Sequence, residues 1–459
     1  MKRKFSASTS PNTGRIIKGR GTVTALSSLA SAVLAATLIA NPASASVNTT
    51  KTVTLNFWGT ESASYYGPAI AKYEHLNPGI KVVYHVFPFD DLDTVISTHM
   101  ETHDGSYAVY EVDEPRTEEF ASRGWLVPMN ASTVAQLKKT VPAEQLGEVS
   151  WNSSVWSLPL TTSTQLLFYN KALLTQAHVP FPGIKVSQGL TWQQLYAEAL
   201  KVHKSTGKAG LLFDQVNRIY QLQPLPQGLG GGPGVTGPNG LTANVDNAAW
   251  VKSMKWYQTC FTSGVTPKSI NASETESYFA SGQAGFFWGG PWNYYPFLSS
   301  KAITKDGMGV APTPHWAGHA TVVPTDSWSV GVNPYSPLRA QGMAFAKWLA
   351  LTPTGTITLM EHSGNGSVIG AGAKPAPGNP PASLLALGKY WELWPSAVAN
   401  LMKYQIYNQS IHRAHTLGWV QYETVIESAF LSIADGSNVQ AVLNNAQSQL
   451  TSDFSAVKP

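Results

Sequence analysis

Three carboxyl groups and one guanidinium fall within six residues of this chain, Glu111-Val112-Asp113-Glu114-Pro115-Arg116. Charged groups are costly to bury unless they are paired. The spacing therefore predicts a site in which these groups hold one another while their remaining oxygens and N–H groups face a ligand. Arg116 suits a ligand with vicinal hydroxyls, because a guanidinium presents its donors in a fixed planar fork. A purely structural cluster of salt bridges is the alternative. Glu111 itself is expected to be a strand-end partner of Arg116.

A second group of candidate residues is aromatic. The apolar run 284–288 predicts a buried strand bounded by glycines. The turn after this strand contains Gly290 and carries the large rings of Trp292 and Tyr294, where small polar residues are usual. Flat rings with polar tips, placed at the carboxyl end of a strand, suit a ligand that offers both C–H faces and hydroxyls, which describes a sugar. The alternative is that Trp292 fills a core.

The loop after the first predicted strand supplies three further candidates, Trp58, Thr60 and Glu61. Alternation along the strand turns the apolar positions 53, 55 and 57 inward, so Trp58 should face the other way, toward a cleft. Glu61 can accept hydrogen bonds from two hydroxyl groups. The alternative for Glu61 is a cap on the helix that follows.

Alternating strands and helices position these candidates. The periodicity predicts strands at 52–58, 80–86 and 107–111, separated by helices at 65–76 and 91–100. This β-α-β-α-β order is typical of a parallel sheet with right-handed crossovers, and the fold class is therefore α/β. Farther along, Thr191 and Gln194 form a capping box that opens a helix, 211–213 is a strand, and 246–261 is a helix with Cys260 in the core.

The first 45 residues predict export. They hold six basic side chains and no acidic one, then an apolar stretch, then Ala43-Ser44-Ala45, a small-x-small cleavage pattern. We interpret residues 1–45 as a secretory signal peptide cleaved near Ala45, with a transmembrane anchor as the alternative. No cysteine lies near this site, so the usual bacterial lipid anchor is excluded, and the single Cys260 precludes an intrachain disulfide.

The net charge argues against nucleic acid as a partner. Without the six basic leader residues, 25 Lys and Arg stand against 27 Asp and Glu, a formal net charge of −2. A nucleic-acid or anionic-membrane surface is usually basic. The remaining length of about 414 residues exceeds what one core usually holds, so we expect two domains.

Taken in order, nine short segments resemble a known family, the extracellular solute-binding proteins of ATP-driven sugar importers, of maltose-binding-protein type. The segments are Phe57-Trp58-Gly59, Asn77-Pro78-Gly79-Ile80-Lys81-Val82, Asp104-Gly105-Ser106, Val112-Asp113-Glu114-Pro115-Arg116, Ser157-Leu158-Pro159-Leu160, Tyr169-Asn170-Lys171, Thr191-Trp192, the run 279–285 and Gly290-Pro291-Trp292. They span essentially the whole chain after the leader.

The resemblance implies a type II periplasmic-binding-protein fold, with a ligand cleft between two lobes. We expect an N-terminal lobe of residues 46–161 plus 329–375 and a C-terminal lobe of residues 162–328 plus 376–459. It further implies a monomer that binds a carbohydrate and docks on ABC transporter permease subunits, in the periplasm or at the cell exterior. No cofactor, metal or catalytic residue is implied.

The resemblance also assigns site residues. Arg116 falls on a family arginine, whereas the family acid beside it is displaced by Pro115, so Asp113 and Glu114 are both candidates. Ser163 stands where the family often has an acid, which counts against maltose itself as the ligand. The remaining implied contacts come from later loops: Asp214, Tyr220, Asp326, Trp328 and Tyr422, with Trp419 and the small-residue loop 363–367 nearby.

Two other classes of function stay open. A secreted glycoside hydrolase would need two carboxyl groups across a sugar, and Asp113 or Glu114 with Asp326 are the available pairs. A binder of a polyol or of ferric ion would use the same architecture, and iron would call on the tyrosine pairs 65–66 and 294–295. Motifs for a nucleophilic serine, for zinc and for phosphate binding do not occur in the sequence.

Overall fold

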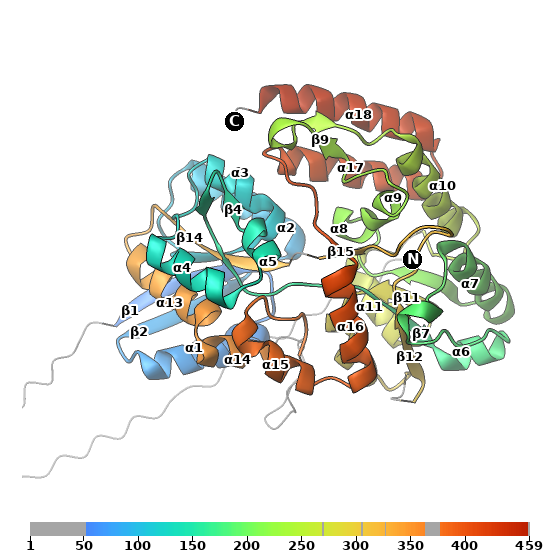
Figure 1. The fold of residues 1–459 in the computed structure, drawn as a ribbon, viewed down its shortest axis with the longest axis horizontal. Coiled ribbons are helices and arrows are strands. Elements are labelled where there is room, and N and C mark those ends of the chain that lie inside the picture. Colours follow the sequence, from blue (N-terminus) through green and yellow to red (C-terminus); the bar gives the residue numbers. More distant parts are fainter. Residues whose placement is uncertain (1–51, 269, 304–305, 326, 363–376, 458–459) are drawn as a thin grey trace, which may run out of the picture. The chain divides into compact units, whose positions relative to one another are not determined.

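The computed structural model describes residues 52–268, 270–303, 306–325, 327–362 and 377–457, so the predicted leader lies outside the described residues. Two β-sheets organise the described chain, and each is covered by helices (Figure 1). We call each sheet with its helices a body. This arrangement confirms the α/β class expected from the sequence.

The first body is built on a five-stranded sheet in the order β2-β1-β3-β14-β6. Strands β1, β2 and β3 are parallel, as predicted, and the late strand β14 joins antiparallel to β3 and to β6. The strands are β1 (Val53–Gly59), β2 (Ile80–Val86), β3 (Val109–Asp113), β6 (Leu158–Pro159) and β14 (Trp328–Val332). Its helices are α1 (Ala63–Leu76), α2 (Phe89–Glu101), α3 (Thr117–Ser122), α4 (Ala131–Thr140), α5 (Ala143–Glu148), α13 (Arg339–Leu351) and α14 (Pro353–Met360).

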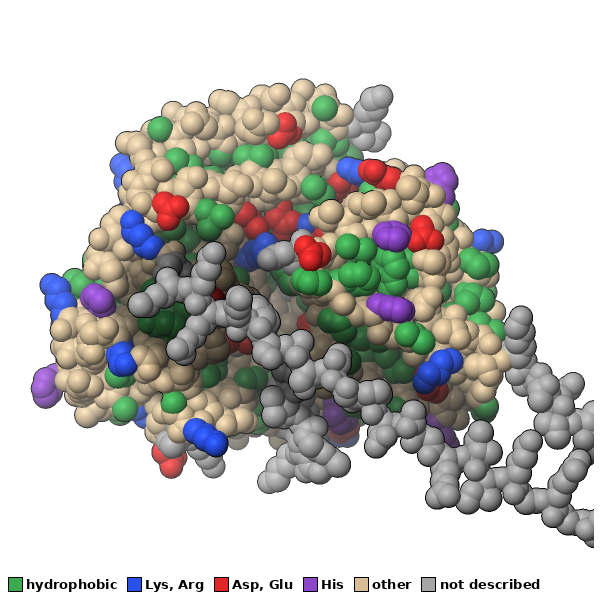
Figure 2. Space-filling model, turned by 180° about the vertical axis from the view of Figure 1, so that it is seen from behind, with side chains coloured by type: hydrophobic (Ala, Val, Ile, Leu, Met, Phe, Trp, Pro, Cys, Tyr) green, Lys and Arg blue, Asp and Glu red, His purple; other side chains and the backbone are tan. Residues whose placement is uncertain are grey.

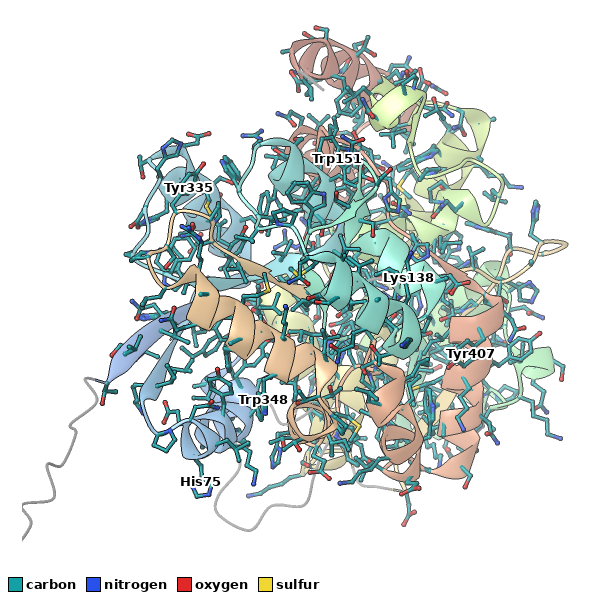
Figure 3. The ribbon with its side chains drawn as sticks, turned by 60° about the vertical axis from the view of Figure 1, so that its left-hand side comes forward. His75, Lys138, Trp151, Tyr335, Trp348 and Tyr407 are labelled. Carbon is teal, nitrogen blue, oxygen red and sulfur yellow. The ribbon has the colours of Figure 1, made fainter. Side chains whose placement is uncertain are left out.

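Both faces of this sheet are buried. One face packs on α1 and α13, which lie side by side, with Tyr73 against Trp348 at 5.2 Å between ring centroids (Figure 3). The other face packs on α2 and α3 around Leu92, Tyr107 and Phe120. A sheet covered on both faces needs apolar residues on both, which explains why alternation in β1 separates two cores and not a core from a cleft.

The second body is built on a four-stranded sheet in the order β12-β7-β11-β8. Its strands are β7 (Leu166–Asn170), β8 (Ala209–Phe213), β11 (Ala284–Gly289) and β12 (Met308–Pro312). Its helices are α6 (Lys171–Gln176), α7 (Trp192–Thr206), α8 (Ile219–Leu222), α9 (Pro224–Gln227), α10 (Ala248–Thr262), α11 (Ala272–Ala280), α12 (Tyr294–Leu298), α15 (Leu384–Glu392), α16 (Ser396–Asn408), α17 (Trp419–Ala434) and α18 (Val439–Ala456).

Short elements complete the described chain. They are the 3-10 turns η1 (Glu114–Arg116), η2 (Val186–Gln188), η3 (Pro238–Gly240) and η4 (Pro291–Asn293), and the two-residue strands β4 (Ser150–Trp151), β5 (Ser154–Val155), β9 (Val235–Thr236), β10 (Thr242–Ala243), β13 (Val323–Pro324) and β15 (Ser410–Ile411). Among the described residues, no helix combines the length and the apolar character needed to cross a bilayer.

Several local predictions are confirmed. Thr191 and Gln194 form the capping box of α7, and Cys260 is fully buried in α10. Strand β3 differs, since it begins and ends two residues later than predicted. Glu111 and Asp113 therefore belong to the strand itself, and only Glu114 to Arg116 form the turn after it.

The polar run after β6 carries the chain from the first sheet to the second. Its side chains are buried, and most of them are hydrogen-bonded: Thr161 donates to Ser327 Oγ at 2.9 Å, and Thr162 pairs with Thr325 at 2.7 Å. The Thr164 hydroxyl and the Gln165 amide nitrogen have no partner among the described residues. A buried crossing must pair its polar groups, because an unmet donor or acceptor costs free energy. This requirement accounts for the unusual polarity of residues 161–165.

Candidate ligand-binding cavity

A cavity of about 360 Å³ lies where the two bodies meet. The first body contributes Thr60, Glu61, Tyr65, Phe89, Asp113 and Trp328, and the second contributes Arg218, Tyr220, Glu276, Trp292, Glu423 and Glu427. Ser163 and Arg413 also line it. Seen from behind, the surface is hollowed near its centre, and acidic and basic side chains gather there (Figure 2). The volume is within the range of ligand pockets, about 300–1,000 Å³.

Aromatic rings form much of the cavity wall. Tyr65 and Tyr220 are each 7% exposed, while Trp292 and Trp328 are half-buried. The rings of Tyr220 and Trp292 lie 6.2 Å apart, and Phe89 meets Trp328 edge-on at 5.9 Å. The sequence placed Tyr220, Trp292 and Trp328 among the candidates, and the structure brings all three to one cavity.

The polar side chains of the wall are held in place by the protein. The Tyr220 hydroxyl donates to Ser163 Oγ at 2.9 Å, so two residues chosen from separate segments are direct neighbours. Arg218 Nη1 lies 3.0 Å from Glu427 Oε2. Arg413 binds both carboxylate oxygens of Asp113, one at 2.7 Å. Groups fixed in this way lose little freedom when a ligand arrives.

Arg413 and Glu276 were missed by sequence reasoning. The segment His412-Arg413-Ala414-His415 places three basic residues in four positions of a chain that is poor in charge, and this was the available signal. Each of the three pairs with an acid of the first body: Arg413 with Asp113, His415 with Glu118 and His412 with Glu148. Hydrogen bonds from the two histidines outweigh burial and lower the pKa of Glu148 to about 2.

The predicted acid–arginine cluster is divided between the cavity and the interior. Arg116 is buried and does not line the cavity, because Asp93 (2.8 Å) and Glu423 take its guanidinium. Glu114 is fully buried and accepts the Ser327 backbone N–H at 2.9 Å. Arg116 and Glu114 thus bind to other protein groups, as the alternative of a purely structural cluster predicted. Asp113 alone of the cluster reaches the cavity.

Glu111 pairs with groups other than Arg116, contrary to expectation. Its carboxylate accepts the Tyr66 hydroxyl and the Thr60 backbone N–H, the latter at 2.5 Å. Burial raises the pKa of Glu111 to about 7. Beside it, Thr60 and Glu61 line the cavity as predicted. Burial, followed by repulsion from Glu111 and Glu276, raises the pKa of Glu61 to about 8.

Three aromatic residues that were predicted to contact the ligand lie away from the cavity. Trp58 stacks on Tyr107 at 3.8 Å under α2, since the second face of the sheet is a core. Tyr294 is buried against Trp394 at 5.1 Å. Tyr422 is fully buried, and its hydroxyl donates to the Pro233 carbonyl at 2.6 Å. The expectation of a cleft position is wrong for each of these rings.

Asp214 and Gly290 also lie outside the cavity lining, directly behind Trp292. Asp214 is buried, and its Oδ2 accepts the Gly290 N–H at 3.3 Å and the Asn293 side-chain amide at 2.9 Å. Asp326 and the loop 363–367 lie outside the described residues.

The described residues hold no group of three or more His, Cys, Asp or Glu arranged for a metal. The tyrosine pairs proposed for iron do not converge, because only Tyr65 lines the cavity, while Tyr66 donates to Glu111 and the pair 294–295 packs on Trp394. A ferric site needs several anionic oxygens that converge on one point.

Comparison with solved structures gives the same architecture. The chain is similar to the GacH receptor of Streptomyces glaucescens GLA.O, solved unliganded and with acarbose (20% identity, TM-score 0.74, covering 89% of this chain and 100% of that one). It is also similar to an ABC substrate-binding protein of Listeria monocytogenes in complex with cycloalternan (16%, 0.75, 88% and 99%) and to maltose-bound T. maritima MalE3 (17%, 0.73, 87% and 99%). These likenesses confirm the two-lobed fold.

Curated relatives match a shorter part of the chain. The maltodextrin-binding protein MdxE of Bacillus subtilis (strain 168) is 28% identical over 183 residues, which is 38% of this chain and 41% of the relative. A galactooligosaccharide-binding protein of the same organism is 29% identical over 167 residues, 34% of this chain and 37% of the relative. The match thus spans about two fifths of these relatives' length.

The family described as bacterial extracellular solute-binding protein matches residues 58–354, well over half of the sequence. This range contains the second sheet, the first sheet apart from most of β1, and most of the residues that line the cavity. The chain belongs to the bacterial extracellular solute-binding proteins.

Proposed function

We propose that this protein captures a mono- or oligosaccharide outside the cytoplasm and delivers it to the permease of an ABC transporter. One observation carries the proposal: a single cavity presents the rings of Trp292, Tyr220 and Tyr65 together with fixed polar groups from both bodies. A sugar offers C–H faces that stack on such rings and hydroxyls that bond to such groups. The maltodextrin, galactooligosaccharide, acarbose, cycloalternan and maltose in the names of the similar proteins support a saccharide ligand.

Capture takes place by closure of the two lobes. A ligand that contacts both lobes at once stabilises the closed arrangement through contacts that the open one lacks. The lobes are residues 46–161 plus 329–375 and residues 162–328 plus 376–459. Small-angle scattering then shows a smaller radius of gyration at saturating ligand, and an unchanged radius contradicts closure.

The protein acts as an exported monomer. The leader 1–45 is removed near Ala45, and the mature chain works in the periplasm or at the cell exterior. Mass spectrometry of the secreted chain tests the cleavage site, since a mature N-terminus far from residue 46 contradicts it.

Calorimetric titration of residues 46–459 tests the ligand class. The panel holds maltotriose, galactobiose, sorbitol and ferric citrate, and product analysis follows overnight incubation with each saccharide. We expect a saccharide to bind and to be recovered intact. Binding of sorbitol or ferric ion alone assigns a different solute, and shortened saccharides assign a hydrolase.

A further inference from the structure

The indole of Trp292 lies directly against the backbone of Gly290. A Cβ atom added at Gly290 would lie 1.9 Å from Cζ3 and 2.1 Å from Cη2 of this ring, far inside contact distance. The backbone of Gly290 is extended, with φ −79° and ψ 165°, a conformation that any residue adopts. The chain therefore does not need glycine here for its own conformation. The missing side chain makes room for the Trp292 ring.

The turn that carries Trp292 is anchored from below by a buried acid. Asp214 follows β8, and its Oδ2 accepts the Gly290 N–H at 3.3 Å and the Asn293 amide at 2.9 Å. These two donors lie on either side of Trp292 in the sequence. A single buried oxygen thus fixes both ends of the turn η4.

The outer side of the ring is also bounded. The Asp214 carbonyl accepts the Thr275 hydroxyl at 2.6 Å, which ties helix α11 to the end of β8. The next residue, Glu276, is hydrogen-bonded to Trp292, and this bond opposes the larger effect of burial, which raises the pKa of Glu276. Tyr220 lies beside the ring at 6.2 Å. The indole is therefore in contact with the Gly290 backbone, is hydrogen-bonded to Glu276, and lies next to the Tyr220 ring.

We propose that Gly290 and Asp214 are positioning residues, which set the Trp292 ring in its stacking orientation before a ligand arrives. The inference rests on the proposed function, in which Trp292 stacks on a sugar. A ring that is already oriented loses little rotational freedom on binding. Neither Gly290 nor Asp214 lines the cavity, so each would influence affinity through Trp292 and not through contact with the ligand.

A double-mutant cycle tests the role of Gly290, with maltotriose as the probe and the mature full chain as the protein. Gly290→Ala should weaken binding about fivefold to thirtyfold, because the methyl group displaces the ring. In a Trp292→Ala background the same change should alter affinity less than about twofold. Gly67→Ala, where the added methyl meets nothing within 4 Å, is the matched control and should leave affinity unchanged. Equal weakening by Gly290→Ala in both backgrounds overturns the proposal.

Two substitutions at Asp214 separate positioning from general support of the fold. Asp214→Asn keeps an oxygen that can accept both hydrogen bonds, so its affinity should stay near that of the wild type. Asp214→Ala removes the anchor and should weaken binding about as much as Gly290→Ala. Thermal melting accompanies each titration. If Asp214→Ala lowers only the melting temperature, and the folded protein binds normally, Asp214 is not a positioning residue.

A measurement without ligand separates failure of this inference from failure of the proposed function. In protein labelled with 5-fluorotryptophan, the ¹⁹F resonance of Trp292 is assigned by its absence from Trp292→Phe. Gly290→Ala should shift this resonance in the ligand-free protein, while Gly67→Ala should not. A shift in a wild-type protein that binds neither maltotriose nor galactobiose supports the positioning role and counts against the carbohydrate function. An unmoved resonance overturns the positioning role whatever the protein binds.

Discussion

Arg413 and Asp113 form a bidentate ion pair between the two bodies, although 300 residues separate them in the sequence. Both side chains line the cavity, and they are only 7% and 5% exposed. The segment that carries Arg413 is held on the second body by Gln223, which bonds to the His412 carbonyl at 2.8 Å and to the Ala414 N–H at 3.1 Å. Asp113 ends β3 of the first sheet. The pair therefore joins the two bodies at the cavity.

Replacing Arg413 by Met should lower the free energy of unfolding by about 3–5 kcal/mol, because it leaves the Asp113 carboxylate buried without its partner. Urea unfolding measures this loss. The matched control is Lys81→Gln at the exposed pair with Glu74, where the lysine is 57% exposed and the expected change is under about 1 kcal/mol. If the two variants lose similar free energies of unfolding, the Arg413–Asp113 pair contributes no more to stability than an exposed ion pair does.

Trp292→Ala should weaken saccharide binding by about 1.5–3 kcal/mol, a tenfold to hundredfold effect, through loss of the stacking surface. The fold should survive, since the ring is half-buried at the cavity and its removal leaves no closed void. Titration calorimetry and thermal melting on the same sample separate the two effects. A destabilised variant whose folded fraction binds normally would defeat the stacking role.

Trp58→Ala should behave in the opposite way. The ring is 8% exposed and stacks on Tyr107 within the core under α2, so truncation should cost about 3–5 kcal/mol of stability. Affinity of the folded protein should stay within about twofold of the wild type. Trp58→Ala is thus the control for Trp292→Ala. If Trp58→Ala weakened binding without lowering stability, Trp58 would be a ligand-binding residue after all.

Glu61→Gln should change how stability depends on pH. Burial, reinforced by Glu111 and Glu276, raises the pKa of Glu61 from 4.5 to about 8 in the folded protein. The folded state then holds the proton more tightly than the unfolded state, so stability is fullest below pH 4.5 and falls as the pH rises to about 8. Gln cannot ionise, so the stability of Glu61→Gln relative to the wild type should be higher at pH 8 than at pH 5 by about 3–4 kcal/mol.

Unfolding at these two pH values, followed by circular dichroism, measures the difference. Glu101→Gln serves as the control, since this side chain is 65% exposed and should shift stability equally at both values. A pH profile of Glu61→Gln that is parallel to that of the wild type would contradict the raised pKa.

The sequence predicts those elements whose signals lie within one segment. Strand β2, the capping box of α7 and the buried Cys260 of α10 each depend on contiguous residues, and each was found where it was expected. Their physical causes are local: side-chain alternation, a side chain bonded to nearby backbone, and helical periodicity.

Distant partners decide the parts that the sequence does not predict. Alternation showed that Trp58 faces away from Phe57, but nothing in β1 states that α2 covers that second face. Arg116 was chosen for its neighbours in the chain, whereas its partners Asp93 and Glu423 come from α2 and α17. Arg413 finds its acid in another lobe. Pairs of this kind are fixed only by the folded arrangement.

The position of β14 has a consequence for synthesis. This strand, Trp328–Val332, lies between β3 and β6, yet the ribosome makes it long after β6 ends at Pro159. At about 5–20 residues per second, the edge of β3 waits on the order of ten to forty-five seconds for its neighbour. An unpaired edge is a template for wrong pairing. The first sheet thus cannot be completed before β14 has been made. Until then the unpaired edge of β3 must be kept from pairing with another strand.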